Sequence, residues 1–500
     1  MTGITSHQVR AVVAEMAGTV DDWRLRRPAR PSAPRFGANW IGPVMAIGST
    51  LVGWFAFTDT LGDDGVGFAL FIGSVSIMLM AWSNLLSTRM IVLEQLFGGV
   101  DRMYRWHRWF GALAVAAMWL HTQTVDDVKG IAGASRDVAE AAEDLASTGT
   151  NIIYALVGIS LLRWIPYRWW RLSHKFLGVP FAFACWHFYT ATKPYANDSW
   201  WGRWFTGFML LGLAAWLHRV VWRDMIRRGR RYRVTLIRRA GDTVTIELEP
   251  VGRGIHYQPG QFAFIKVQAR GLSEPHPFTI ASTPGESVLR FVIRDLGDWS
   301  GRLAQTLSLG DSVLVEGPYG RLELLPATDD RPVLWIAGGV GVTPFLAAAT
   351  ASSSARSHRP QMIFCVRSRD DAPGLETLER AADEGRIELH VFASAEGRRL
   401  SAEALDEVIA DVSIAEAHVV MCGPTALVRD MRAALVARGV PHVHVEGFDI
   451  RTGIGPDLSR QVDQLLWRWF PSMASKQNDE GPESDEAPAT AGVRSGAKGN

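Results

Sequence analysis

Four histidines in two apolar stretches have the residue type and the spacing to bind a metal-containing group. His107 and His121 lie in RWHRWFGALAVAAMWLHTQ, and His174 and His187 lie in LSHKFLGVPFAFACWHFYT. Each stretch is apolar and long enough to cross a bilayer core of about 30 Å, at about 1.5 Å of rise per residue. Because ligating side chains are costly at that depth, they are usually functional there. The two pairs therefore predict two helices that clamp a planar group between them.

The spacing within each pair places the histidines at two depths. His107 and His121 are fourteen positions apart, about 40° short of four full helical turns, so they share one face. His174 and His187 are thirteen apart, about 140° short of four turns, and Pro180 between them can bend the helix and bring both rings round. An imidazole on each side of a haem gives six-coordinate iron, which favours electron transfer. These four residues are the predicted metal ligands of two haem b groups; the alternative is four unrelated histidines.

Length and composition limit the possible classes of protein. The 500 residues predict roughly three domains: residues 39–222 are rich in Trp, Phe, Leu and Gly, whereas charges are spread through residues 227–450. A formal net charge of +1 argues against nucleic acid as a partner. The three cysteines are widely separated and form no CxxC pair, so neither a zinc site, an iron–sulfur cluster nor a disulfide is expected. No cleavable signal peptide is expected either.

The apolar half predicts a multi-pass membrane protein. We expect six spans, near residues 39–57, 66–86, 106–122, 151–167, 175–191 and 203–222. Basic residues gather before the first span, between the second and third, between the fourth and fifth, and after the sixth, whereas loops 59–65 and 124–149 are acidic. Because basic loops stay on the cytoplasmic side, we expect a protein of the cell membrane with both termini in the cytoplasm. The first histidine of each pair then lies near the inner leaflet and the second near the outer leaflet.

The second half changes its periodicity once. Short alternating strands are expected at residues 232–239, 243–250, 260–268, 288–295 and 311–317, which predicts an antiparallel barrel. From residue 332 strands alternate with helices, which predicts an α/β domain. Its first turn, GGVG at residues 338–341, lets backbone N–H groups approach a pyrophosphate at a helix N-terminus.

Five short motifs carry a family resemblance. They are HPFT (276–279), GDWS (297–300), GPYG (317–320), GGVGVTP (338–344) and CGP (422–424). Together they resemble the NADPH oxidase and ferric reductase family, within the wider ferredoxin–NADP reductase group. The resemblance covers about residues 85–450, and the four histidines fit it at the family's spacing. It implies a cytoplasmic flavin and nucleotide module joined to a membrane haem domain.

The resemblance assigns the expected FAD site. HPFT would line the isoalloxazine ring, with Thr279 near its reactive nitrogen, while Arg294 and the Gly297–Ser300 turn would hold the pyrophosphate. A guanidinium and a hydroxyl on a glycine turn suit phosphate oxygens, and an aromatic edge suits a flat ring. Ser300 stands where the family often has Thr, and it keeps the hydroxyl. The residues expected to bind FAD are His276, Pro277, Phe278, Thr279, Arg294, Gly297, Trp299 and Ser300.

The resemblance also assigns the nucleotide site. The expected catalytic residues are Thr279, Cys422 near the nicotinamide, and Phe448 over the flavin face. Arg367 matches the family's basic position for the 2′-phosphate of NADPH, so NADPH is favoured and NADH is possible. Arg398 or Arg399 could close the other side of that pocket. The alternative is that Arg367 and these two arginines are solvated loop charges paired with Asp370, Asp371 and Glu396. The residues expected to bind the nucleotide are Gly338, Gly339, Gly341, Thr343, Pro344, Arg367, Ser394, Arg398, Arg399, Cys422, Gly423 and Pro424.

We therefore expect a multi-domain membrane protein with a six-helix transmembrane bundle, an antiparallel β-barrel FAD domain and an α/β nucleotide-binding domain. The expected boundaries are a cytoplasmic segment at 1–36, the haem domain at 37–226, the FAD domain at 227–326, the NAD(P)H domain at 327–450 and an amphipathic, disordered tail at 451–500.

The resemblance implies electron flow from cytoplasmic NADPH through FAD and two haems to an extracytoplasmic one-electron acceptor, expected to be oxygen that gives superoxide. One alternative is a ferric-chelate reductase with the same relay; another is a non-enzymatic sensor or transporter with a degenerate reductase domain. The expected partners are the lipid bilayer and this small-molecule acceptor, with no obligate protein partner.

Overall fold

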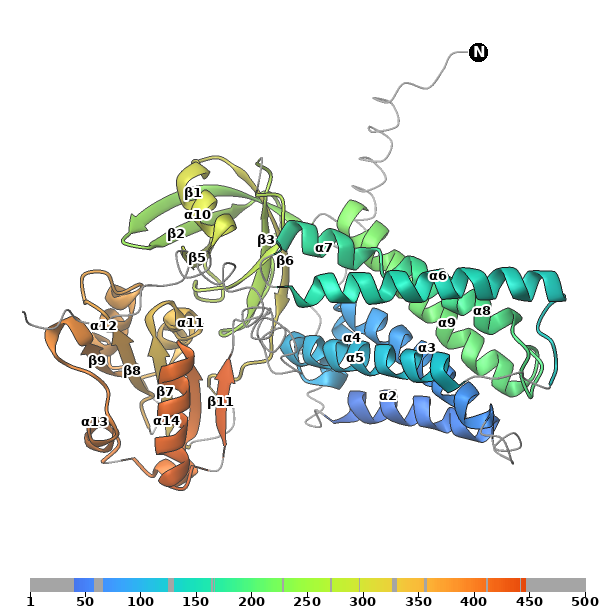
Figure 1. Ribbon diagram of the computed structural model, residues 1–500. Helices are drawn as coiled ribbons and strands as arrows, with labels where there is room; N and C mark the ends of the chain where they lie inside the picture. The colour runs from blue at the N-terminus through green and yellow to red at the C-terminus, as the bar shows by residue number, and fades with distance from the viewer. Residues whose placement is uncertain are drawn as a thin grey trace, which may run out of the picture.

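Helices form the first half of the chain and two β-sheets form the second half (Figure 1). The predicted N-terminal segment and C-terminal tail lie outside the residues that the structure, a computed structural model, describes. Those residues are 40–57, 66–124, 130–162, 165, 167–226, 229–269, 272–295, 297–325, 331–354, 358–410, 412–440 and 442–446.

Every predicted span contains a helix. Helix α3 packs against α5 and α9, and α6 packs against α8. The helices are α2 (Ile41–Leu51, extended by a 3₁₀ turn at Val52–Ala56), α3 (Val66–Ser87), α4 (Ile91–Phe97), α5 (Val100–Thr124), α6 (Arg136–Leu161), α7 (Tyr167–Lys175), α8 (Gly178–Thr190) and α9 (Trp200–Leu217, continued as a π-helix at His218–Ile226).

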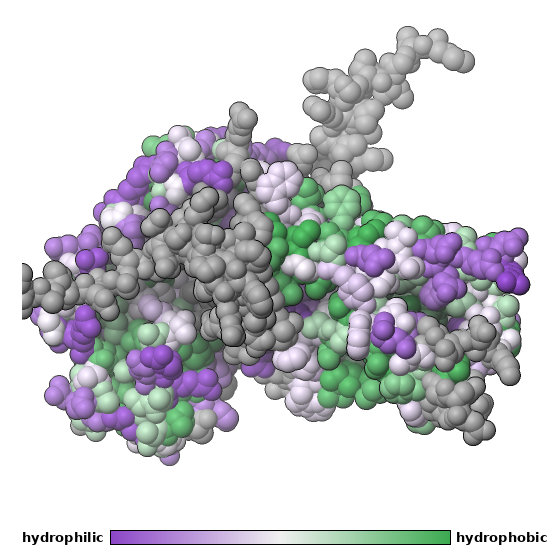
Figure 2. All heavy atoms as spheres, in the orientation of Figure 1, coloured by the Kyte–Doolittle hydropathy of each residue, from purple (hydrophilic) through white to green (hydrophobic). Residues whose placement is uncertain are grey.

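Length and apolarity alone do not confirm six spans. Among the described residues, two helices are long and apolar enough to cross a membrane, Val66–Ser87 and Trp200–Trp222. Helix α8 has 13 residues, about 20 Å of rise, which is short for a bilayer core of about 30 Å. Hydrophobic side chains nevertheless cover much of the visible helical surface (Figure 2). Trp119, Leu210 and Trp200 are among the exposed apolar residues of these helices. Such a surface is typical of a helical layer that faces lipid.

Helix α6 corrects the predicted loop at residues 124–149. It begins at Arg136, fifteen positions before the predicted span, and continues to Leu161. The segment RDVAEAAEDLA is rich in the strong helix formers Ala, Glu and Leu, and Arg136 pairs with Glu140 one turn later at 2.7 Å. Acidic side chains oppose burial in lipid but do not oppose a helix, so the span continues as an exposed helix.

The break in the second histidine stretch lies before Pro180. Helix α7 ends at Lys175, and a tight turn follows in which the N–H of Phe176 donates to Ser173 O at 3.0 Å. Pro180 is the third residue of α8, where a missing N–H costs nothing because the first turn leaves its donors unused. The prediction that Pro180 bends one continuous helix was therefore wrong. His174 and His187 lie on two separate helices.

The first sheet is antiparallel but not closed. Its strand order is β4-β3-β6-β1-β2-β5, and the bounds are β1 (Arg230–Ala240), β2 (Thr243–Pro250), β3 (Phe262–Val267), β4 (His276–Thr279), β5 (Leu289–Arg294) and β6 (Ser312–Tyr319). Strands β4 and β5 are the two edges of the sheet and form no ladder with each other in the described residues. Just after β4, the Ala281 N–H donates to Arg290 O of β5 at 2.8 Å. Helix α10 (Asp298–Thr306) places Trp299 and Leu303 in the core of this sheet. The predicted barrel is thus a half-open one.

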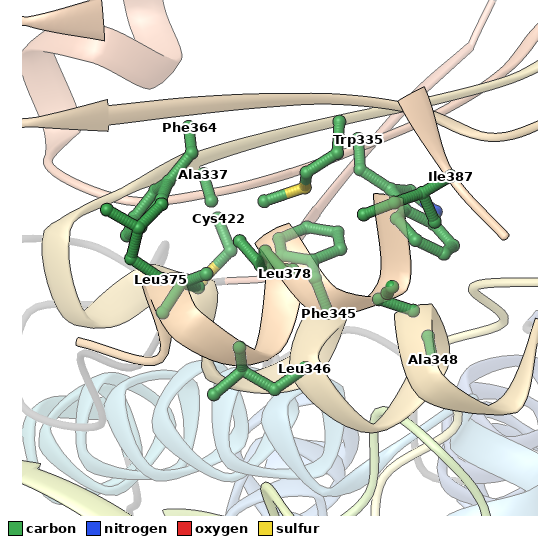
Figure 3. Close-up of a cluster of buried hydrophobic side chains, with 14 of the residues drawn as sticks. Trp335, Ala337, Phe345, Leu346, Ala348, Phe364, Leu375, Leu378, Ile387 and Cys422 are labelled. Carbon is green, nitrogen blue, oxygen red and sulfur yellow. The ribbon is translucent and has the colours of Figure 1, made fainter. Parts of the chain in front are cut away.

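The second sheet confirms the predicted α/β domain. Its strands are all parallel in the order β11-β10-β7-β8-β9, and apolar residues of helices and strands fill both faces, as Figure 3 shows for the face with Trp335, Phe345 and Phe364. The elements are β7 (Val333–Gly338), a 3₁₀ turn (Gly339–Val342), α11 (Thr343–Ala351), β8 (Gln361–Val366), α12 (Leu375–Asp383), β9 (Glu388–Ala393), α13 (Ala402–Val408), β10 (His418–Cys422), α14 (Thr425–Ala437) and β11 (Val443–Glu446).

Candidate functional site

The first histidine of each stretch faces the first histidine of the other. The ring centres of His107 on α5 and His174 on α7 are 5.9 Å apart, with the ring planes at 70°. Two imidazoles on one metal ion place their centres roughly 6 Å apart, from about 2 Å between metal and each nitrogen and about 1 Å from nitrogen to ring centre. Trp170 stacks on His174 at 5.1 Å. The observed separation therefore fits one metal ion between the two rings.

Carbonyl groups of α3 fix the tautomer of both histidines on α5. Nδ1 of His107 lies 2.9 Å from Ser83 O, and Nδ1 of His121 lies 2.9 Å from Ala69 O. Since a carbonyl only accepts, Nδ1–H donates and Nε2 keeps the lone pair that a metal ligand needs. Sequence reasoning missed these two partners. The available signal was spacing, because Ala69 and Ser83 are fourteen positions apart, as are the two histidines.

The second histidine of each stretch, His121 or His187, also lies in surroundings that suit a metal ligand. A Cβ atom on Gly73 would lie 2.8 Å from Nδ1 of His121, so this ring needs a glycine beside it. His187 is electrostatically close to His121, and its buried Nδ1 has no hydrogen-bond partner among the described residues. Beside Gly111 on α5 and Gly158 on α6, an added Cβ would meet no described atom within 4 Å. Paired imidazoles, fixed tautomers and open space beside glycines together fit two haem groups.

The HPFT motif forms β4, and Trp299 covers it. The Trp299 ring stacks on His276 at 4.3 Å and lies 5.7 Å from the Phe278 ring. The Thr279 hydroxyl and the Trp299 indole N–H are buried without a hydrogen-bond partner among the described residues. Such groups are costly unless a ligand or water satisfies them, so this part of the sheet fits a bound ring system with polar edges.

His276 is uncharged at neutral pH. Burial lowers its pKa to about 4, and the nearby Arg171 of α7 lowers it in the same direction. A neutral imidazole adds no charge to the surface that would line the predicted flavin.

The predicted pyrophosphate residues lie close in sequence but have protein partners. Arg294 ends β5 and pairs with Asp242 at 2.5 Å, while the Ser300 hydroxyl donates to Gly297 O at 3.0 Å at the start of α10. The Arg294–Asp242 pair is about half exposed, and such pairs are worth about 0–1 kcal/mol. Arg294 can therefore exchange this carboxylate for a phosphate at little cost.

The GGVG turn and the CGP element meet at one edge of the parallel sheet. A Cβ atom on Gly341 would lie 2.5 Å from Cys422 O, and one on Gly338 would lie 2.6 Å from the Cδ atom of Pro424. Gly339 has φ +53°, and a Cβ there would meet no described atom. This edge is the carboxyl end of β7 and β10, where the order of the strands reverses and open α/β sheets bind their ligands. Residues more than 80 positions apart in the chain thus form one candidate nucleotide site.

Two of the residues predicted to bind the nucleotide, Cys422 and Thr343, are not displayed in that site. Cys422 is 1% exposed and belongs to the same apolar cluster as Ala337 and Leu375 (Figure 3). Thr343 is buried at the start of α11, where its hydroxyl donates to Val340 O at 3.1 Å. Phe448 lies outside the described residues.

The loops after β8 and β9 lie beside each other. The N–H of Ala395 donates to Arg367 O at 2.8 Å, which brings Arg367 beside the Ser394–Arg399 loop. Among the described residues Arg367 forms no ion pair, whereas Arg369 pairs with Glu379 at 2.9 Å. The alternative pairing with Asp370, Asp371 or Glu396 is absent from this part of the chain. Arg367 therefore remains available to an anionic ligand.

Known families match all three parts of this arrangement. A ferric reductase-like transmembrane component matches residues 72–185, an FAD-binding domain matches residues 228–323, and an oxidoreductase NAD-binding domain matches residues 335–433. The chain has the domains of the NADPH oxidase and ferric reductase family. These are the FAD-binding and NAD-binding domains of oxidoreductases, joined here to a membrane component.

Individual relatives share parts of the chain. Respiratory burst oxidase homolog protein E of Arabidopsis thaliana is 33% identical over 120 residues, 19% of this chain and 12% of that protein. Homolog protein A of Solanum tuberosum is 33% identical over 143 residues, 23% and 14% of the two chains. The 2-halobenzoate 1,2-dioxygenase electron transfer component of Burkholderia cepacia is 27% identical over 202 residues, 39% and 58%. The chain thus spans less than two thirds of each of these relatives.

Solved structures align at lower identity. Flavohemoglobin from Malassezia yamatoensis aligns with 81% of this chain and 96% of its own, at 18% identity and a TM-score of 0.42. The FAD/NAD-binding domain of nitric oxide dioxygenase from Vibrio cholerae aligns with 44% of this chain at 24% identity and a TM-score of 0.38. At these scores the likeness supports no argument about arrangement or function.

Proposed function

We propose that the chain carries electrons from cytoplasmic NADPH through FAD and two bis-histidine haem b groups to a one-electron acceptor on the opposite side of the membrane, with oxygen giving superoxide. The observation that carries the proposal is the pair of facing histidines, His107 and His174, whose ring centres are 5.9 Å apart. When bound, the cofactors supply the step from hydride transfer to single-electron transfer. The proposal includes six spans with both termini in the cytoplasm.

The residues of the chain hold and shield these groups. Ser83 O and Ala69 O orient the imidazoles of α5 toward a metal, and Trp299 closes over the HPFT strand. The neutral His276 leaves the flavin surface without an added charge. The glycines of the nucleotide edge let backbone N–H groups reach a pyrophosphate. Each of these contributions is positioning, so the proposal needs no acid or base from the protein at the haems.

A ferric chelate is the second candidate acceptor, and one cavity favours it. A cavity of about 330 Å³ lies at the end of α8 that carries His187. Its volume is at the lower limit of small-molecule sites, roughly 300–1,000 Å³, and it is much larger than the roughly 30 Å³ of one water molecule. Its lining residues are Ile131, Ala132, Gly133, Tyr189, Tyr195, Ala196, Asn197 and Asp198. The hydroxyl of Tyr195 is buried without a partner among the described residues, so it is available to an acceptor.

The test is to supply NADPH to the purified full-length protein in lipid nanodiscs and to measure the products side by side. Superoxide is followed by the reduction of cytochrome c that superoxide dismutase abolishes, and ferrous iron by a chromogenic chelator under argon. We expect the haem spectrum to become reduced and superoxide to appear in air. Ferrous iron without superoxide would select the chelate reductase. Haem that no nicotinamide cofactor reduces would support the non-enzymatic alternative.

We also predict a preference for NADPH that depends on Arg367. One charge-assisted contact to the 2′-phosphate contributes about 1.5–3 kcal/mol, so Arg367→Ala should lower the preference roughly ten- to a hundredfold, mainly through KM. The measurement is kcat/KM for NADPH and NADH in both proteins. Arg369→Ala is the matched control, because Arg369 is already paired with Glu379 and should leave the preference unchanged. Equal constants for the two nucleotides in the unmutated enzyme would contradict the assignment.

A further inference from the structure

One arginine connects the antiparallel sheet of β1–β6, called the flavin sheet from here on, with α5, the helix that carries the predicted inner haem ligand His107. Arg89 lies between α3 and α4, is 9% exposed and has φ +54°, which is uncommon for a residue with a side chain. Its Nε donates to the Tyr104 hydroxyl on α5 at 2.6 Å, and its guanidinium lies 3.7 Å from the centre of the Phe264 ring on β3. A single buried cation therefore contacts both halves of the protein.

Surrounding groups compensate the buried charge. Burial opposes the charged form of Arg89, but Tyr104, Glu316 and Tyr319 outweigh it and raise the pKa of the guanidinium. A guanidinium over an aromatic face also gains a cation–π attraction that is strongest when water is excluded. Because an isolated buried charge would be costly, these contacts are coupled to one another. Loss of any one of them should loosen the others.

A second set of contacts lies beside the first. The Gly320 N–H of the GPYG turn donates to Glu94 Oε1 on α4 at 2.9 Å, and Arg321 donates to Gln95 O at 3.1 Å. Glu94 is buried, and burial raises the pKa of its carboxyl, while the Gly320 N–H opposes that rise. The apolar residues between the two halves form one cluster of Val100, Phe264 and Tyr319, with Tyr104 and Phe262 packed against it.

These contacts between the two halves lie close to both predicted cofactor sites. On β3, Phe262 and Phe264 are paired directly with Thr279 and Pro277 of the HPFT strand. On α5, the Tyr104 ring lies 6.5 Å from the His107 ring. The helix of the facing ligand approaches the same strand, since Arg171 of α7 is electrostatically close to His276. Both inner-ligand helices thus lie near the surroundings of the predicted flavin.

We infer that Arg89, together with Glu94, is a positioning element that fastens the flavin sheet to α5 and so fixes the separation between the flavin and the inner haem. The inference rests on the proposed function. Contacts between domains of one chain usually permit relative motion unless the interface is large and apolar. Electron transfer rates fall steeply with separation, so a small displacement would slow haem reduction while the flavin site itself stays intact.

The test uses full-length Arg89→Met with FAD and haem bound, in nanodiscs. Methionine keeps a long, unbranched side chain but removes the positive charge and the N–H donors of Arg89. We expect NADPH-driven reduction of a soluble dye, which takes electrons at the flavin, to change less than about twofold, and haem reduction in stopped flow to slow about tenfold or more, in line with the cost of small misplacements. Hydrogen exchange of peptides covering 262–267 and 317–321 should rise.

Controls separate docking from general damage. Arg105→Met removes an arginine of α5 whose one ion pair within the described part of the chain is with Asp101 at 3.2 Å, near the surface, and this variant should behave as the unmutated protein. Glu94→Gln keeps an acceptor for Gly320 N–H and should slow haem reduction less than Glu94→Ala does. If Arg89→Met fails to fold, this second pair decides the question.

Unchanged haem reduction together with unchanged exchange in Arg89→Met or Glu94→Ala would overturn the inference. If the unmutated protein binds no haem, the proposed function fails by itself. The exchange measurement still decides whether Arg89 holds the two halves together, so the two failures are distinguishable.

Discussion

Replacement of His107 or His174 by alanine is expected to remove one haem, and replacement of His121 or His187 to remove the other. Each iron needs both axial nitrogens, and the residue left behind cannot hold a six-coordinate haem alone. A pyridine haemochrome assay should therefore give half the haem of the unmutated protein in each variant. Transfer from NADPH to the outer acceptor should fall to background, because either loss interrupts the relay.

The control for this series is His218→Ala. His218 begins the π-helical continuation of α9 and belongs to neither histidine pair. The haem content of His218→Ala should equal that of the unmutated protein. Dye reduction by NADPH should persist in all five variants, since the flavin and nucleotide sites lie in the sheets. Undiminished haem in all four ligand variants would refute the two-haem relay.

The sequence predicted those features that depend on residues close together in the chain. The fourteen-residue spacing of His107 and His121 already placed them on one face, because helical geometry alone determines it. The alternation of apolar residues located β1, β2, β5 and β6 to within about two residues, since burial on one face has a period of two. The parallel sheet followed from the regular alternation of strands with helices.

The sequence did not predict those features that tertiary contacts decide. Arg89 and Phe264 are 175 positions apart, and no local pattern marks either of them as a partner of the other. Closure of the barrel depends on whether the edge strands β4 and β5 pair along their length, which the alternation of apolar residues does not determine. The true start of α6 was missed because acidic residues were interpreted as a loop, although they disfavour only the membrane. The helix break at Phe176 has no proline to announce it.

The approach of the GGVG turn to the CGP element also comes from tertiary pairing. Residues His418–Cys422 of β10 lie in register with Val333–Ala337 of β7, so the turns that follow the two strands must touch. Sequence motifs named both turns as nucleotide-binding, but only the strand order places them against each other. The glycines there serve backbone contact as well as ligand access.

Gly341→Ala is expected to abolish hydride transfer from NADPH while FAD and haem remain bound. A Cβ atom at this position would lie 2.5 Å from Cys422 O, 2.7 Å from Cys422 C and 2.9 Å from Gly423 Cα. These are backbone atoms of a buried strand end, so no side-chain rotation relieves the overlap, and the turn must move away from the CGP element. Because a small misplacement can cost about a hundredfold, NADPH-driven flavin reduction should fall by about that factor or more.

The measurement is stopped-flow flavin reduction by NADPH, with dithionite as a second reductant that bypasses the nucleotide site. Dithionite should reduce the haems of Gly341→Ala as fully as those of the unmutated protein. Gly439→Ala is the matched control, because its φ of +84° makes alanine unfavourable by roughly 1–2 kcal/mol, yet its Cβ would meet no described atom. That variant should lose stability in a thermal melt but keep its rate of flavin reduction. If Gly341→Ala instead kept the unmutated rate, the edge between β7 and β10 would not be the nucleotide site, because its backbone contact could be broken without consequence.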